Sequence, residues 1–234
     1  MKLGILLPLF RDKVDDALDA AVAAEDAGLD GIFAYDHLWP IGHRERPAFA
    51  PFPVLARALT MTSRVMVGPL VARVGLVENA VLDAQFRSLS AIGPGRVLAP
   101  LGVGDGLSAK ENEAYGLAQL PADDRRAQLT ELAKDLQVRG IPTWVGGSGP
   151  KSIAVARATG SAVNLWSQPA SVVAEHAKTG EVTWAGDLPA AGEGLAEHLA
   201  ELEQAGATWA IATYARSAEE LVDAAKSGGW FTPG

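Results

Sequence analysis

Two neighbouring ionisable residues, Asp36 and His37, directly follow a short apolar segment at residues 31–35. Because an imidazole titrates near neutral pH, an acid and a histidine side by side at the end of a strand can transfer a proton in a reaction. The same pair also fits a structural role, in which Asp36 caps a turn and His37 is an exposed loop residue. The residue types alone leave both interpretations open.

The sharpest local signal for anion binding is the loop at residues 146–149, which continues into Pro150 and Lys151. The loop consists of Gly146, Gly147, Ser148 and Gly149. Glycines let backbone N–H groups converge on an anion, Pro150 suits the first position of a helix, and the helix dipole attracts negative charge. Lys151 adds a positive charge. The loop therefore predicts a phosphate site, and a well-formed turn is the alternative.

Two further loops hold candidate ligand-binding residues. Arg73 follows an apolar segment at residues 64–71, where it can bind an anion or a ligand carbonyl, although a solvated surface arginine is the commoner case. Gly104 is the middle one of three alternating glycines and precedes Asp105. Such glycines allow a ligand to approach the backbone closely, but many barrels use the same kind of loop only to turn.

The elements that must position these residues alternate regularly along the chain. Strands are predicted at residues 2–9, 31–35, 64–71, 95–103, 142–145, 162–166, 181–185 and 208–213, and the segments between them have helical spacing. The first helix is expected to start at Asp12 as N-cap and to end at Gly28, and a capping box from Ser108 to Glu111 is expected to open a later helix. Another helix is predicted at residues 122–138.

Eight strand–helix pairs predict a parallel α/β sheet that closes into a (β/α)8 TIM barrel, with its active site on the loops after the carboxyl ends of the strands. An open doubly wound sheet is the alternative, but it usually has fewer strands. No linker divides the sequence, so residues 1–234 are expected to form a single barrel domain.

Composition excludes several classes of function. The chain has no cysteine, which excludes disulfides, thiolate metal sites and cysteine nucleophiles and fits a reducing cytoplasm. A net charge of −8 disfavours broad nucleic-acid binding. No apolar segment approaches the roughly 20 residues that span a membrane, and no signal peptide is recognised, so we expect a cytoplasmic protein. His43, His176 and His198 lack metal-ligand spacing, and no metal site is expected.

Taken in order, several motifs resemble those of the bacterial luciferase-like monooxygenase superfamily, most of all its branch that uses the deazaflavin coenzyme F420. The motifs are GILLPLF, EDAGLDGIFAYDHLW, TSRVMVGPLV, GRVLAPLGVGDGLSAKENEAYG and PTWVGGSGPK. The similarity runs from Met1 to about Asn164. It implies a (β/α)8 barrel with the ring of the cofactor lying across the strand ends.

The resemblance also implies residue roles. His37, steered by Asp36, matches the acid or base near substrate and ring, and Asp105 is the second choice for that role. A non-prolyl cis peptide is expected between Leu70 and Val71, where it shapes a bulge behind the ring. The loop at residues 146–149 matches the one that holds the cofactor phosphate. Arg73, Gly104 and Lys151 complete the expected cofactor-binding set.

One departure from the family is expected to affect the pocket. Between Leu136 and Ile141 the family normally inserts several tens of residues that cover the mouth of the active site, whereas here a helix runs almost directly into a strand. We therefore expect a shallower pocket.

Three functions remain open. The first is an oxidoreductase that transfers a hydride between a small organic substrate and F420. The second is an FMN-dependent monooxygenase or oxidoreductase, and the third is a trimmed, non-catalytic flavin-binding protein. Dimers are common among the proteins that the sequence resembles, so a homodimer is possible.

Overall fold

The computed structural model describes residues 1–40, 42–104, 106–189, 194–213 and 218–229, and Asp105 lies outside them. The strands are β1 (Lys2–Leu6), β2 (Gly31–Ala34), β3 (Met66–Pro69), β4 (Ala72–Arg73), β5 (Ala99–Gly102), β6 (Thr143–Gly146), β7 (Ala162–Trp166), β8 (Val182–Gly186) and β9 (Ala207–Ala212). The helices are α1 (Asp15–Ala27), α2 (Pro51–Met61), α3 (Asn79–Ile92), α4 (Gly106–Ala114), α5 (Ala122–Val138), α6 (Pro150–Thr159), α7 (Ala170–Ala177), α8 (Leu195–Gln204) and α9 (Ala218–Ser227).

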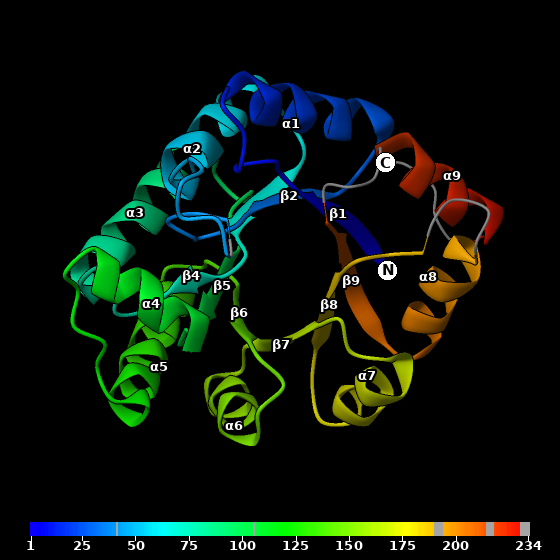
Figure 1. The fold of residues 1–234 in the computed structure, drawn as a ribbon. Coiled ribbons are helices and arrows are strands. Elements are labelled where there is room, and N and C mark those ends of the chain that lie inside the picture. Colours follow the sequence, from blue (N-terminus) through cyan, green and yellow to red (C-terminus); the bar gives the residue numbers. More distant parts are fainter. Residues whose placement is uncertain (41, 105, 190–193, 214–217, 230–234) are drawn as a thin grey trace.

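The parallel strands form a closed barrel with the helices outside it (Figure 1). The sheet order runs β3-β2-β1-β9-β8-β7-β6-β5-β4, and β3 and β4 are consecutive parts of one strand position. Val67 of that position also bridges Val97 ahead of β5, which joins the two ends of the sheet. The eight positions confirm the predicted (β/α)8 barrel.

The peptide bond between Leu70 and Val71, which separates β3 from β4, is cis, as the family resemblance implied. The Val71 side chain lies against two glycines. A Cβ atom added to Gly102 would lie 2.4 Å from Val71 Cγ2, and one added to Gly146 would lie 2.9 Å from Val71 Cγ1. The absence of side chains at both glycines therefore makes room for Val71.

The interior of the barrel is packed with aromatic rings. Phe33, Trp144 and Trp209 form a cluster with ring centroids 5.4 to 5.7 Å apart. Two glycines make room for them, because a Cβ atom at Gly4 would lie 2.8 Å from the Phe33 ring and one at Gly31 would lie 2.8 Å from the Trp209 ring. A second apolar layer, between strands and helices, buries residues such as Leu55, Phe86 and Leu199. This interior is a packed core, so ligands are restricted to the ends of the strands.

Helix boundaries follow the sequence signals in part. Helix α5 has the predicted bounds, and Gly28 ends α1 in the left-handed conformation with φ 99°. The prediction for Asp12 is wrong, because α1 begins at Asp15 with Val14 at the N-cap and no side-chain cap. Two acidic residues in its first turn, Asp15 and Asp16, interact favourably with the helix dipole instead.

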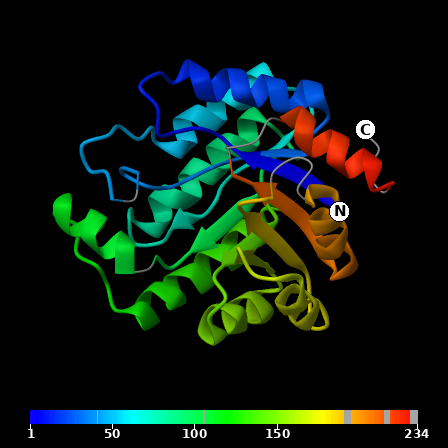
Figure 2. The same cartoon turned by 45° about the vertical axis from the view of Figure 1, so that its right-hand side comes forward.

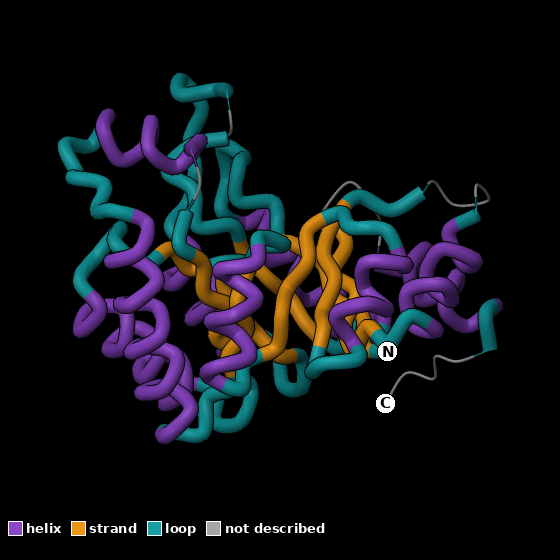
Figure 3. The backbone as a smooth tube through the Cα atoms, turned by 90° about the horizontal axis from the view of Figure 1, so that it is seen from below, coloured by secondary structure: helices purple, strands orange, loops and turns teal. Residues whose placement is uncertain are grey.

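Loops after the strands and turns before them lie at opposite edges of the barrel, as the side view of Figure 3 shows. The connection from α5 to β6 is a turn before a strand, so it lies at the edge opposite to the loops that follow the strands. A segment inserted between Leu136 and Ile141 would begin and end there. The expectation of a shallower pocket stays a prediction, and the place of this connection indicates that an inserted segment would start away from the mouth.

Within the described ranges, no helix combines the length and the apolar character needed to cross a lipid bilayer.

Candidate active site

Four ionisable side chains meet at the carboxyl ends of β2 and β4. Asp36 and His37 follow β2, Arg73 ends β4, and Glu111 comes from α4. In Figure 2, α4 (green) lies beyond the strand ends, on the same side of the barrel as the long loop after β2. Because β2, β4 and β5 are close neighbours in the closed barrel, residues more than 70 positions apart in the chain come together here.

Glu111 joins two of these residues. Its Oε1 atom lies 2.9 Å from Nδ1 of His37, and its Oε2 atom lies 2.8 Å from Nη1 of Arg73. The side chains of Glu111 and Arg73 are 4% and 6% exposed, whereas that of His37 is 20% exposed. The predicted capping box at Ser108 is wrong, because α4 begins at Gly106 and the Glu111 carboxylate turns toward His37 and Arg73.

Asp36 contacts the backbone rather than the imidazole. Its Oδ2 atom accepts a hydrogen bond of 2.9 Å from the backbone N–H of Arg73. Burial raises the pKa of Asp36, and the Arg73 N–H, the Arg73 cation and His37 oppose that rise. The carboxyl group beside the His37 ring is therefore that of Glu111, and the expectation that Asp36 steers His37 is wrong. Asp36 instead fixes the end of β4 next to the ring.

The Arg73 guanidinium is buried, and among the described residues its nitrogens have no hydrogen-bond partner. Its contact with Glu111 has the distance of an ion pair but is not a hydrogen bond. The Oδ1 atom of neighbouring Asn112 is buried and unpaired as well. Both residues line a cavity of about 10 Å³, which is about the size that holds one water molecule. Arg73 thus faces α4 and the interior rather than the open mouth.

Aromatic rings lie across the mouth. Tyr35, just after β2, stacks on Phe10 with ring centroids 5.5 Å apart and lies 6.0 Å from the ring of Trp166 at the end of β7. Because β2 and β7 hold the second and sixth of eight barrel positions, these rings approach each other from opposite sides. Burial and the nearby Asp187 carboxylate raise the pKa of Tyr35. Trp166 is 42% exposed, so its ring is available to a ligand.

The predicted phosphate loop lies at the same edge, after β6. Gly147 has φ 120°, and Gly149, the N-cap of α6, has open space around its Cβ position. Ser148 and Lys151 are exposed, and Nζ of Lys151 lies 3.2 Å from Oδ1 of Asp123. The loop and the start of α6 thus face solvent, as an anion site requires, while the lysine forms an exposed ion pair with α5.

The sequence-predicted site residues therefore fall into separate groups. Asp36, His37 and Arg73 come together, and Val71 packs against Gly146 beside the phosphate loop. Leu70 is 5% exposed within the barrel interior, and Gly104, with φ 70°, lies in the loop before α4.

Sequence reasoning missed Glu111 and Tyr35. The signals that could have found them were an acid in the first helix after the Gly102–Gly106 loop and an aromatic residue at the end of a strand.

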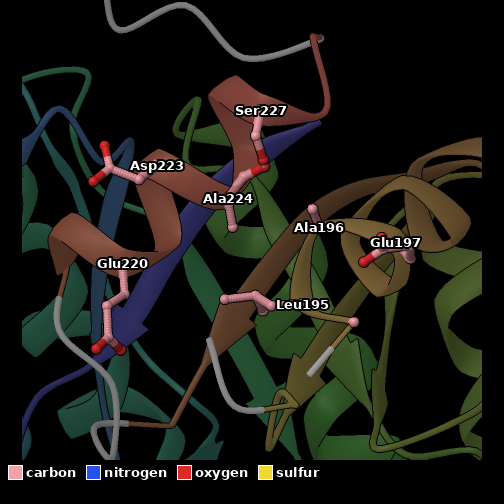
Figure 4. A pocket seen from close by; sticks show the side chains of 8 residues that line it. Leu195, Ala196, Glu197, Glu220, Asp223, Ala224 and Ser227 are labelled. Carbon is pink, nitrogen blue, oxygen red and sulfur yellow. Dashed lines mark hydrogen bonds between the residues drawn. The ribbon is translucent and has the colours of Figure 1, made fainter. Parts of the chain in front are cut away.

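A second hollow of about 480 Å³ lies between α8 and α9 (Figure 4). Its polar side chains are mainly acidic, with Glu197 on α8 and Glu220 and Asp223 on α9. None of the four clustered ionisable residues lines it. Over the described ranges, no group of three or more His, Asp or Glu side chains is arranged to hold a metal ion.

Residues 1–137 match the family described as luciferase-like monooxygenase. An F420-dependent glucose-6-phosphate dehydrogenase of Beutenbergia cavernae is 36% identical over 132 residues, which are 56% of this chain but only 37% of the relative. The corresponding enzyme of Nakamurella multipartita is 39% identical over 114 residues, 48% of this chain and 33% of that protein. The aligned region thus spans about a third of these relatives.

Solved structures share the fold over nearly the whole chain. An F420-dependent secondary alcohol dehydrogenase, in complex with an F420-acetone adduct, superposes with a TM-score of 0.81 at 14% identity, covering 97% of this chain and 98% of that one. At this identity the likeness establishes the barrel fold and does not extend to a substrate.

Proposed function

Since the chain belongs to the luciferase-like monooxygenase family, we propose that it is an oxidoreductase that transfers a hydride between a small organic substrate and coenzyme F420. The observation that carries the proposal is the half-buried His37 ring, held at the strand ends by Glu111 and on the same edge as the glycine loop after β6. The F420-dependent relatives support the choice of cofactor.

The residues after β6 fit the anionic tail of the cofactor. A left-handed Gly147, an exposed Ser148 and an unobstructed Gly149 precede Pro150 at the first position of α6. Backbone N–H groups at a helix N-terminus attract phosphate, and the ten residues of α6 supply the dipole. Lys151 would add charge after leaving its exposed pair with Asp123, which costs little.

The ring system would lie between this loop and His37, against the rings of Tyr35 or Trp166. When bound, the deazaflavin exchanges a hydride with the substrate. His37 accepts the proton that leaves the substrate during its oxidation and returns that proton during reduction. Asp36 and Arg73 hold the adjoining backbone in place.

A binding titration tests the cofactor. We expect F420 to quench tryptophan fluorescence with a lower Kd than FMN, and Trp166→Phe to remove much of the quenching because Trp166 is the partly exposed ring at the mouth. Both cofactors are compared in both redox states. Tighter binding of FMN, together with oxygen consumption by the reduced complex, would favour the FMN-dependent alternative.

A trimmed, non-catalytic role remains the second candidate because the aligned region spans so little of the F420-dependent relatives. His37→Ala separates the two. Loss of turnover with retained F420 binding supports the oxidoreductase, whereas unchanged turnover, or binding of neither cofactor, contradicts it.

A further inference from the structure

We propose that Glu111 is the positioning residue of this site: it holds a proton on Nδ1 of His37 and leaves Nε2 as the atom that exchanges protons with the substrate. The catalytic part of this inference rests on the proposed function. The protonation of the ring does not, and it can be measured in the protein without any cofactor.

A hydrogen bond joins Glu111 to the ring of His37. Oε1 of Glu111 lies 2.9 Å from Nδ1 of His37, within the range of a charge-assisted hydrogen bond. Glu111 also forms an ion pair with Arg73, whose Nη1 atom lies 2.8 Å from the other carboxylate oxygen. An ionised carboxylate only accepts hydrogen bonds, so Nδ1 must be the donor. In a neutral imidazole the hydrogen bond at one nitrogen decides which nitrogen carries the proton.

The other ring nitrogen of His37, Nε2, lies on a side chain that is partly exposed. His37 is 20% exposed, whereas Glu111 is 4% exposed. In the part of the chain that the structure describes, Nε2 of His37 has no hydrogen-bond partner. A neutral ring protonated at Nδ1 therefore presents a free lone pair at Nε2, which is what a general base needs.

A second contact joins the end of α4 to the loop that carries His37. Tyr115, four residues after Glu111, stacks on Trp39 with ring centroids 5.6 Å apart and planes 22° apart. Trp39 is 8% exposed and lies two residues after His37. Glu111 and Tyr115, which are four residues apart, thus contact His37 and Trp39 of the loop after β2. This arrangement fixes the loop relative to α4 and limits rotation of the His37 ring away from Glu111.

The experiment is a long-range ¹H–¹⁵N NMR spectrum of the histidine rings in the cofactor-free protein. The chain has four histidines, and His37→Gln assigns the signal of interest. Spectra are taken at a pH where the rings are neutral. We expect His37 in the Nδ1–H form, a shift of that population to the Nε2–H form in Glu111→Leu, and no change in Glu113→Gln, which alters an exposed acid on the same helix.

Because Glu111→Leu leaves Arg73 buried without its ion-pair partner, that variant is paired with Arg73→Met/Glu111→Leu, which removes both charges. If the single variant does not fold, the double variant takes its place. An Nε2–H form in the wild-type protein overturns the proposal, as does an Nδ1–H form that persists without Glu111. An Nδ1–H ring in a protein that binds neither F420 nor FMN contradicts only the proposed function.

Discussion

The two sides of the barrel mouth hold their side chains in different ways. On the side built by β2, β4 and α4, the ionisable groups are buried and tied to one another, with Glu111 contacting both His37 and Arg73. On the side that includes the ends of β6 and β7, the glycine loop and the Trp166 ring face solvent, and Lys151 forms only an exposed ion pair. The family match of residues 1–137 covers the first side and stops before the second.

Under the proposed function, this difference separates two tasks. A group that transfers protons needs a fixed orientation, which buried contacts provide. A surface that receives a large anionic cofactor needs open backbone donors, which glycines provide. Substitutions on the first side are therefore expected to alter stability, and those on the second side to alter binding with little effect on stability.

The largest effect is expected at the buried ion pair. Arg73→Met leaves Glu111 buried without its cation, which typically lowers the free energy of unfolding by about 3–5 kcal/mol. Adding Glu111→Leu removes the second charge and should restore most of that loss. Urea denaturation of the two variants and the wild type measures this. Equal instability of the single and double variants would show that the ion pair does not account for the loss.

A smaller effect is expected where Val71 lies against glycine. A Cβ atom at residue 102 would lie 2.4 Å from Val71 Cγ2, so Gly102→Ala should cost about 1–3 kcal/mol through overpacking. Val71→Ala in the same chain should recover part of it. Gly149→Ala is the matched control, since Gly149 has open space and an ordinary φ of −72°, and it should stay within about 0.5 kcal/mol. Thermal unfolding distinguishes the variants, and a control as unstable as Gly102→Ala would contradict the steric explanation.

The pH dependence of the free energy of unfolding is expected to show the raised pKa of Asp36. Burial raises its pKa in the folded protein, so the folded state holds the proton more tightly than the unfolded chain does. The stability that this proton contributes is present at low pH and is lost as pH rises through the raised pKa. Between about pH 4 and about pH 8, the free energy of unfolding should therefore fall more for the wild type than for Asp36→Asn. Parallel curves for the two proteins would contradict this prediction.

The smallest effect on stability is expected at Lys151, whose ion pair with Asp123 is exposed on both sides. Lys151→Ala should change the free energy of unfolding by less than about 0.5 kcal/mol. If the loop holds the cofactor phosphate, the same variant should weaken F420 binding, more at low salt than at high salt. A salt-independent Kd equal to that of the wild type would remove Lys151 from the binding site.

The barrel was predictable from the sequence because its signals are local. The bounds of α5 and β7 follow from hydrophobic spacing, and Gly28 and Gly160 end helices where a left-handed residue is needed. The network around His37 was not predictable in this way. Glu111 has the spacing of a capping box with Ser108, and only closure of the barrel brings it to a histidine 74 residues earlier in the chain. The spacing of residues along the sequence therefore does not predict that contact.

The short turn between α5 and β6 offers a practical opening for protein engineering. Val138 is 90% exposed and Gly140 adopts a left-handed φ of 77°, so the chain reverses there with little burial. New termini, an affinity tag or an inserted reporter domain at this turn would project from the edge of the barrel opposite to the candidate active site. The protein could then be immobilised there with the candidate active site free.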